Sequence, residues 1–195
     1  MKPHLILASA SARRQELLSS VGIDLEILPS QVEENAVEGE TAEAHVLRLA
    51  RAKAEEISPK RPGQWVLAAD TVVEVDGKIL GKPRDRAEAE EMLRMLSAKE
   101  HRVTTGYCLL RSSPPQRKEG VVTSRVRFKA LAPEEIRWYV KTGEPFDKAG
   151  GYAIQGQAAF MVEEMNGSYT NVVGLPLCEV VEALRAVEAI DLFRA

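Results

Sequence analysis

Apolar residues recur along this 195-residue chain at two spacings, one typical of helices and the other of strands. Leu5 to Ala8 is a short apolar run that predicts a buried strand, and the helical spacing after it predicts a helix ending at Gly22. Positions 23–27 alternate between apolar and polar residues, which predicts a second strand. Thr41 suits the N-cap of a long helix over positions 42–57.

The later part of the chain predicts further strands and helices in mixed order. The interrupted apolar run WVLAADTVVEV predicts a strand, and the Asp76-Gly77 pair after it predicts a hairpin. The remaining expected elements are a capped helix from Asp85 to Leu96, strands at Val103–Leu110 and 122–128, a helix between Pro133 and Gly143, a strand at Tyr152–Val162, and a helix at Leu175–Ala189. The polar, proline-rich segment from Ser112 to Gly120 is expected to be a surface linker.

Strands mixed with helices, and at least one hairpin, predict an α/β fold with a mixed sheet rather than a doubly wound parallel sheet. The length of 195 residues suits a single domain spanning 1–195.

Composition and charge exclude several classes of protein. The net charge of −3 gives no support to a nucleic-acid-binding protein, which usually carries a basic stripe. Two distant cysteines, Cys108 and Cys178, form neither a zinc pattern nor a disulfide framework and fit a reducing compartment. The first residues resemble no signal peptide, and no apolar run is long enough for a membrane span. We therefore expect a cytoplasmic protein without a membrane or nucleic-acid partner.

The segment SASARR places hydroxyls and guanidinium groups where a strand ends and a helix begins. Free backbone N–H groups and the positive end of the helix dipole lie there, so Ser9, Ser11, Arg13 and Arg14 together suit phosphate groups. The alternative is an ordinary serine cap followed by two solvated arginines.

Lys53 and Asp70 are charged residues in apolar surroundings. Lys53 shares the spacing of the apolar stripe of its helix, where it must extend to solvent, pair with an acid or serve a site. Asp70 interrupts an apolar strand, where an unpaired carboxylate would be costly, so it is the first candidate for a general base or metal ligand. A strand-end cap is the weaker alternative. Glu33 is one acid among several in an acidic loop.

Two glycine-containing segments suggest contact with a ligand. The run from Gly77 to Pro83 is too short between its glycines for a P-loop and lacks the Ser or Thr that binds magnesium, although Lys82 could still reach a phosphate. In DKAGGYAIQG the glycines permit close backbone approach, and the carboxamide of Gln155 could bind the edge of a base. A plain loop is the alternative for Gly150-Gly151.

Taken together, these segments resemble the Maf family of nucleotide pyrophosphatases. The matching stretches, in the order of the family, are ASASARR, AADTVV with GKP, TGY, TGEPFDKAGGYAIQG and GSYTNVVGLPL, which extend from Ala8 to Leu177. The resemblance implies an ITPase-like α/β fold with two lobes around a cleft. It also implies a homodimer and hydrolysis of a nucleoside triphosphate to its monophosphate and pyrophosphate with a divalent cation, Mg²⁺ or Mn²⁺.

The resemblance also implies roles for individual residues. Asp70 matches the catalytic proton acceptor of the family, which would bind the metal together with Glu33. Arg13, Thr71 and Gln155 match positions linked to base choice, and their identities resemble the dTTP/UTP branch. The other polar positions of the expected substrate site are Ser9, Arg14, Lys53 and Lys82.

The alternative hypothesis is a nucleotide-binding regulator of cell division and septum formation that does not need to hydrolyse its ligand. A carboxylate such as Asp70 would not help a protein bind a polyanion unless a metal lies between them. Asp70 therefore favours an enzyme over a binding protein, and the resemblance implies that such an enzyme removes unwanted or modified nucleotides.

Overall fold

The computed structural model describes residues 5–192, which contain seven strands and six α-helices. The strands are β1 (Leu5–Leu7), β2 (Leu25–Ile27), β3 (Trp65–Val75), β4 (Lys78–Leu80), β5 (Glu100–Ser112), β6 (Pro115–Phe128) and β7 (Val162–Asn166). The helices are α1 (Ala12–Ser20), α2 (Ala42–Ile57), α3 (Arg86–Leu96), α4 (Pro133–Lys141), α5 (Tyr169–Val173) and α6 (Leu177–Ala186). No helix among these residues is long and apolar enough to cross a membrane.

The strands form one mixed sheet in the order β2-β1-β3-β5-β6-β7, with β4 beside β3. β1 pairs in parallel with both β2 and β3, whereas β4 is antiparallel to β3 and β7 is antiparallel to β6. The predicted α/β fold with a mixed sheet is therefore confirmed.

The chain divides into two compact units. Of the described residues, the first comprises 5–70, 105–122 and 174–192, and the second comprises 71–104 and 123–173. β3, β5 and β6 each contribute residues to both units. The single-domain organisation over 1–195 stays a prediction.

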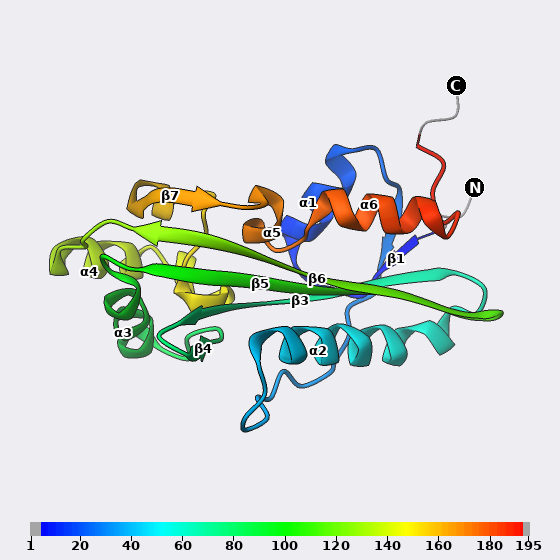
Figure 1. Cartoon of the computed structure of the whole chain (residues 1–195), viewed down its shortest axis with the longest axis horizontal. Helices are drawn as coiled ribbons and strands as arrows, with labels where there is room; N and C mark the ends of the chain where they lie inside the picture. The colour runs from blue at the N-terminus through cyan, green and yellow to red at the C-terminus, as the bar shows by residue number, and fades with distance from the viewer. Residues whose placement is uncertain (1–4, 193–195) are drawn as a thin grey trace. The chain divides into compact units, whose positions relative to one another are not determined.

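In the first unit, helices cover both faces of the strands, with α2 on one side and α1 and α6 on the other (Figure 1). Successive strand residues point to opposite faces, so β1 contributes to two separate cores. Leu5 and Leu7 pack with residues of α1 and α6, and Ile6 packs with residues of α2. This sandwich fixes the position of α2 relative to the first half of β3.

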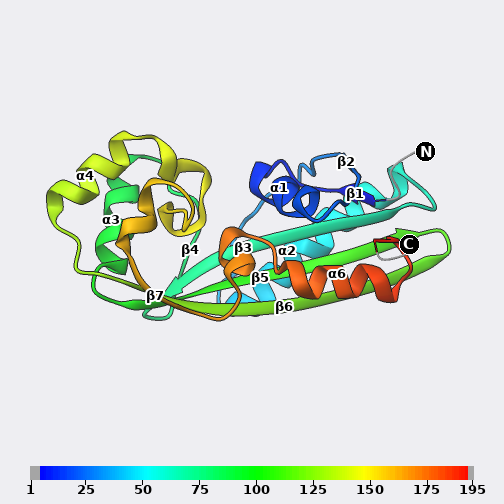
Figure 2. The same cartoon turned by 90° about the horizontal axis from the view of Figure 1, so that it is seen from above.

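The second unit has its own hydrophobic core. α3 and α4 pack against each other beside the 3₁₀ turns that follow α4 (Figure 2). Their buried side chains meet those of the second half of β3, the start of β5 and the end of β6, with Phe128 and Tyr139 fully buried.

Local sequence signals place several boundaries correctly. The side chain of Thr41 accepts a hydrogen bond from the amide of Ala44, so α2 begins where its N-cap predicts. The side chain of Asp85 likewise caps α3 by accepting from the amide of Glu88. Asp76 and Gly77 both have positive φ, as expected for the hairpin between β3 and β4.

Two predicted segments are wrong. The expected linker at Ser112–Gly120 is mostly strand, because β5 runs through Ser112 and β6 starts at Pro115. Its residues are partly or fully exposed, so the apolar alternation that marks a half-buried strand is missing, and proline is tolerated at the first strand position. The expected strand at Tyr152–Val162 is instead irregular chain and a 3₁₀ turn, because Gly156 has a φ of 92° and interrupts extended structure, and β7 begins only at Val162.

Candidate active site

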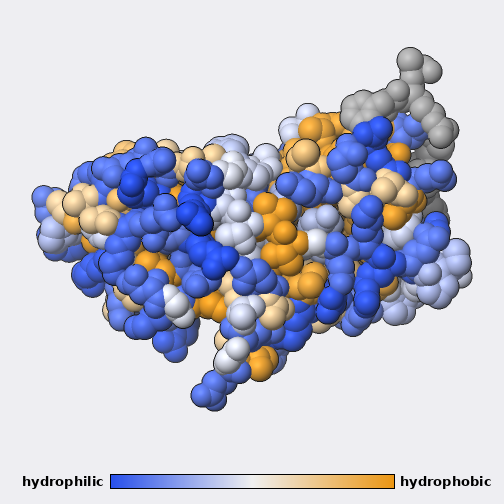
Figure 3. All heavy atoms as spheres, in the orientation of Figure 1, coloured by the Kyte–Doolittle hydropathy of each residue, from blue (hydrophilic) through white to orange (hydrophobic). Residues whose placement is uncertain are grey.

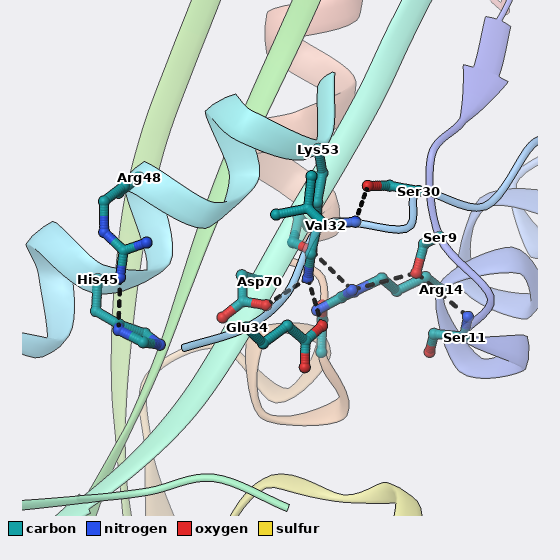
Figure 4. Close-up of polar contacts among 12 residues, drawn as sticks. Ser9, Ser11, Arg14, Ser30, Val32, Glu34, His45, Arg48, Lys53 and Asp70 are labelled. Carbon is teal, nitrogen blue, oxygen red and sulfur yellow. Dashed lines mark hydrogen bonds and ion pairs between the residues drawn. The ribbon is translucent and has the colours of Figure 1, made fainter. Parts of the chain in front are cut away.

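The centre of the candidate site is a buried lysine that binds two carboxylates. Lys53 Nζ donates to Asp70 Oδ1 and to Glu34 Oε1, each at 2.6 Å (Figure 4). The side chains of Lys53 and Asp70 are each only 8% exposed, whereas that of Glu34 is 40% exposed. The pair thus lies inside the first unit, with Glu34 closing it on the side of the solvent.

The local sequence explains why these groups meet. Lys53 belongs to the stripe Val46, Leu49, Lys53 and Ile57, whose apolar members are fully buried, so α2 points its ammonium group inward. Asp70 follows five fully or almost fully buried residues of β3, so its carboxylate emerges from an apolar strand. Of the three outcomes considered for Lys53, the structure contains pairing with an acid, while its role in a site stays a prediction.

Arg14 is the second buried cation of this region. Its Nε donates to the carbonyl of Gly174 at 2.8 Å, and its Nη1 donates to the carbonyl of Ala69 at 2.8 Å and to Ser9 Oγ at 3.3 Å. Burial lowers the pKa of the Arg14 guanidinium, while the charges of Asp70 and Glu34 raise it. Arg14 therefore holds the residue that precedes Asp70 and places a positive charge near both carboxylates.

The start of α1 is organised around Ser9. Ser9 Oγ accepts from the amide of Ser11 at 3.2 Å as well as from Arg14. Ser11 occupies the N-cap of α1 without a side-chain cap bond, so the simple alternative of a serine cap is not what the structure contains. Arg13 is half-buried, and its charge is close enough to lower the pKa of Arg14.

Sequence reasoning named Glu33 and missed Glu34. Lys53 binds Glu34, whereas Glu33 Oε2 accepts from Asn35 Nδ2 at 2.9 Å. Both glutamates lie in a segment without helix or strand, so no periodicity distinguishes the one that faces α2. The metal role of Glu33 stays a prediction, and geometry adds Glu34 as a candidate.

The other predicted site residues belong to the second unit. Thr71, half-buried, directly follows Asp70 in β3, and Lys82 is exposed after β4. Gln155 is exposed just before Gly156. Within this unit, the amide of Gly150 donates to the carbonyl of Gly81 at 2.9 Å. This bond joins the GKP segment, residues 81–83, to the glycine pair Gly150-Gly151.

The carboxylates can be tested against the divalent cation that the sequence implies. No group of three or more His, Cys, Asp or Glu side chains is placed to hold a metal in the described part of the chain. Asp70 and Glu34 nevertheless converge on Lys53, and Mg²⁺ often takes one or two carboxylates and completes its shell with water and substrate phosphates. The residues fit a magnesium or manganese ion bound together with a nucleotide, not a metal held by protein ligands alone.

Comparison with known proteins gives a family. The model of the family described as "Maf-like protein" matches residues 4–187. A dTTP/UTP pyrophosphatase of Geotalea uraniireducens is 54% identical over 194 residues, covering 97% of this chain and 98% of its own length. A dTTP/UTP pyrophosphatase of Syntrophus aciditrophicus is 52% identical over 181 residues, covering 93% and 88%.

Among solved structures, the Ham1 protein of Staphylococcus aureus aligns over 94% of this chain and 98% of its own. Its sequence identity is 14% and its TM-score 0.47, a likeness too distant to define the fold. The family match covers nearly the whole chain, and the matched range contains every residue of the candidate site. The chain therefore belongs to the Maf-like protein family.

Proposed function

We propose that this chain is a nucleoside triphosphate pyrophosphatase that hydrolyses dTTP and UTP to the monophosphate and pyrophosphate. The observation that carries the proposal is the buried Asp70 carboxylate, held by Lys53 in a chain 54% identical to a dTTP/UTP pyrophosphatase. A buried carboxylate beside exposed acids and several cations suits proton transfer and phosphate chemistry better than simple binding.

In the proposed reaction, Asp70 accepts a proton from a water molecule as that water attacks the α-phosphorus. A new bond forms between the water oxygen and the α-phosphorus, the bond from the α-phosphorus to the bridging oxygen breaks, and pyrophosphate leaves with the bonding electrons. Lys53 holds Oδ1 of Asp70, which leaves the other oxygen of the carboxylate to receive the proton.

The positive side chains would offset charge that develops on the phosphates. We assign this role to Arg13, Arg14, Lys53 and Lys82, with Ser9 as a further polar contact. A bound Mg²⁺ or Mn²⁺ would supply Lewis acidity and charge neutralisation. Asp70 and Glu34 are the residues that would hold it, together with Glu33 as the sequence predicts, and without such an ion these acids would repel a triphosphate.

Base choice is assigned to Arg13, Thr71 and Gln155. Support comes from the carboxamide of Gln155, which offers two donors and one acceptor on an exposed side chain next to a glycine with positive φ. The imide edge of uracil or thymine presents acceptor, donor and acceptor, and a carboxamide can bond one adjacent donor and acceptor of that edge at once.

Pyrophosphate release tests the proposed function directly. Purified protein with Mg²⁺ is given dTTP, UTP, CTP, ATP and GTP, and products are separated by chromatography. We expect monophosphate and pyrophosphate in equal amounts, with dTTP and UTP as the best substrates. Nucleotide binding without any product would overturn the proposal and favour a regulator that does not hydrolyse its ligand.

Three further properties belong to the same proposal. We propose that the protein acts as a single domain over 1–195, forms a homodimer, and works in the cytoplasm with a nucleotide as its partner. Cys108 and Cys178 are both free thiols, which supports a reducing compartment. Light scattering coupled to gel filtration tests the dimer, since a mass of 21.5 kDa would contradict it.

A further inference from the structure

The segment that carries Glu34 is long and irregular. Residues 28–41 join β2 to α2 without any helix or strand, and irregular connections of this length are usually functional or disordered. The segment projects beside α2 (Figures 1 and 3), and none of its residues is buried. Apolar burial therefore does little to hold it, and polar contacts must define its conformation.

One end of the segment is fastened to the C-terminal part of α2. Glu56 Oε2 accepts from Ser30 Oγ at 2.6 Å and from the amide of Gln31 at 2.8 Å. Lys60 binds the other oxygen of the same carboxylate at 2.9 Å. This contact fixes the chain where it leaves β2, three residues before Glu34.

The other end is fastened to the N-terminal part of α2 by Arg48. Its Nε and Nη2 donate to the two carboxylate oxygens of Glu40 at 2.8 and 2.7 Å, and Nη2 also donates to the carbonyl of Asn35 at 3.0 Å. His45 Nδ1 lies 3.1 Å from the same Glu40 carboxylate. The Glu40 side chain is only 11% exposed. A bidentate contact between an arginine and a carboxylate fixes the relative orientation of the two groups as well as their distance.

Glu34 lies between these two attachments and next to Asn35, whose carbonyl Arg48 binds. An exposed glutamate on an unrestrained loop would lose much of its contact with Lys53 to conformational entropy. Arg48 and Lys53 belong to the same helix, α2 (Figure 4). The helix therefore fixes the distance between Arg48, which binds the loop, and the ammonium group of Lys53, which binds Glu34.

We propose that Arg48 is a positioning residue, which clamps the loop through Glu40 and the Asn35 carbonyl and thereby holds Glu34 against Lys53 and beside Asp70. The inference rests on the proposed hydrolysis for its kinetic consequence and not for the clamp itself. In this proposal Arg48 acts through Glu34 rather than through contact with the nucleotide.

The structure offers a matched control on the same helix. Arg51 also binds a glutamate through Nε and Nη2, but its partner Glu119 is on β6 rather than on the loop. Replacing Arg51 removes a similar bidentate ion pair from α2 and leaves the contacts of Arg48 with residues 28–41 in place. Arg48→Lys keeps the positive charge of Arg48 but loses the planar guanidinium group that binds both oxygens of a carboxylate.

The first measurement is amide hydrogen exchange in peptides covering residues 29–41, with no nucleotide present. We expect exchange in Arg48→Ala to rise about tenfold, the scale of a contact worth about 1.4 kcal/mol. Arg48→Lys should fall between it and the wild type, and Arg51→Ala should match the wild type. Equal exchange in wild type and Arg48→Ala would overturn the clamp whether or not the protein hydrolyses nucleotides.

The second measurement is a double-mutant cycle in kcat/KM for UTP. Arg48→Ala should lower kcat/KM about tenfold, mainly through kcat, but should have less than about a twofold effect in a Glu34→Gln background, because residues of one network are not additive. Equal losses in both backgrounds, or a loss confined to KM, would overturn positioning through Glu34 and indicate direct contact with the substrate. Should Arg48→Ala fail to fold, Arg48→Lys and Glu40→Gln replace it in the cycle.

Faster amide exchange in Arg48→Ala with unchanged kcat/KM would show that Arg48 holds the loop but does not position Glu34, and it would overturn the inference. A wild-type protein that releases no pyrophosphate would instead contradict the proposed function, and the exchange experiment would still decide the clamp.

Discussion

Asp70 accepts a 2.6 Å hydrogen bond from Lys53 at a place where only 6% of either residue is exposed. Removing two charges from water costs several kcal/mol per ion, and well-packed apolar residues often stabilise a fold as well as a buried pair does. Stability alone is therefore a weak explanation for this pair. Lys53 binds both Asp70 and Glu34, and this arrangement is better explained by the chemistry proposed for Asp70.

The first prediction replaces Asp70 by Asn. The new side chain has nearly the same shape and can still accept a hydrogen bond from Lys53, but it cannot take a proton from water. We expect kcat for UTP to fall at least about a hundredfold, the usual scale for a general base. The melting temperature should stay within about 3 °C, because Lys53 keeps Glu34 as a charged partner.

Asp76→Asn is the matched control for that variant. Asp76 also accepts a 2.6 Å hydrogen bond from a lysine, Lys99, but its side chain is 64% exposed at a hairpin turn. Its activity should equal that of the wild type. A near-normal rate in Asp70→Asn would remove the proton-acceptor role from Asp70.

The second prediction concerns the metal. EDTA in excess should abolish pyrophosphate release, and Mg²⁺ or Mn²⁺ added beyond the chelator should restore it, because the acids near Lys53 would otherwise repel the triphosphate. Circular dichroism should not change with chelator, since fewer than three potential ligands cluster anywhere in residues 5–192. Undiminished activity in chelator would exclude a metal from the reaction.

Local signals in the sequence were enough to predict Lys53 and Asp70 as candidates. The spacing of Lys53 on the apolar stripe of α2 and the interruption of β3 by Asp70 are both properties of a single element. Their contact follows once α2 packs on β3. Thr41 and Asp85 similarly cap their own helices, so α2 and α3 begin where expected.

Residues that depend on contacts between distant segments could not be predicted in this way. Glu34 and Glu33 are chemically identical neighbours in an irregular loop, and the choice between them is made by Arg48 and Glu56 on α2. The β5–β6 extension was missed because its exposed polar residues do not alternate with apolar ones.

The third prediction uses the pH dependence of the Arg48–Glu40 contact. The Arg48 hydrogen bond, with a smaller contribution from His45, holds the pKa of Glu40 at about 2 against opposing burial. A carboxylate whose pKa is lowered by folding stabilises the fold above its unfolded pKa of about 4.3, and this stabilisation disappears as the pH falls towards about 2.

Wild type and Glu40→Gln are therefore compared by urea unfolding from pH 7 to pH 2.5. The wild type should be more stable above about pH 5, and the margin should shrink below about pH 4. The difference between the two proteins is the relevant quantity because other carboxylates titrate in both. A margin that does not change down to pH 2.5 would contradict the assigned contact.

The fourth prediction concerns Gly106 in the TGY segment. A Cβ at this position would lie 2.7 Å from the carbonyl carbon of Val46 and 2.9 Å from the amide nitrogen of Leu47, both in the backbone of α2. Gly106→Ala should therefore push α2 away from β5 and cost about 1–3 kcal/mol of unfolding free energy. Because α2 carries Lys53, activity should also fall.

Gly81→Ala is the control, since it has open space around its Cβ position and no positive φ. Its stability should be unchanged or up to about 1 kcal/mol higher. Urea unfolding measures both variants, and equal stability of the two would contradict close packing of α2 at Gly106.

The last prediction concerns base choice by Gln155, an exposed residue next to Gly156, whose φ of 92° few other residues adopt. Gln155→Glu removes both amide donors and adds a charge, so an acceptor on uracil or thymine would lose its partner at a cost of about 1–3 kcal/mol. That corresponds to a fall of about ten- to a hundredfold in kcat/KM for UTP and dTTP. GTP, which does not present the imide edge, should be a poor substrate for the wild type and should lose little in the variant. Gln157 is an exposed glutamine two residues further along the same segment, so Gln157→Glu is the control and should leave the order of substrates unchanged.

The measurement is kcat/KM for UTP, dTTP, CTP and GTP with all three proteins. If GTP leads in the wild type, or if all four substrates lose equally in Gln155→Glu, Gln155 does not select the base.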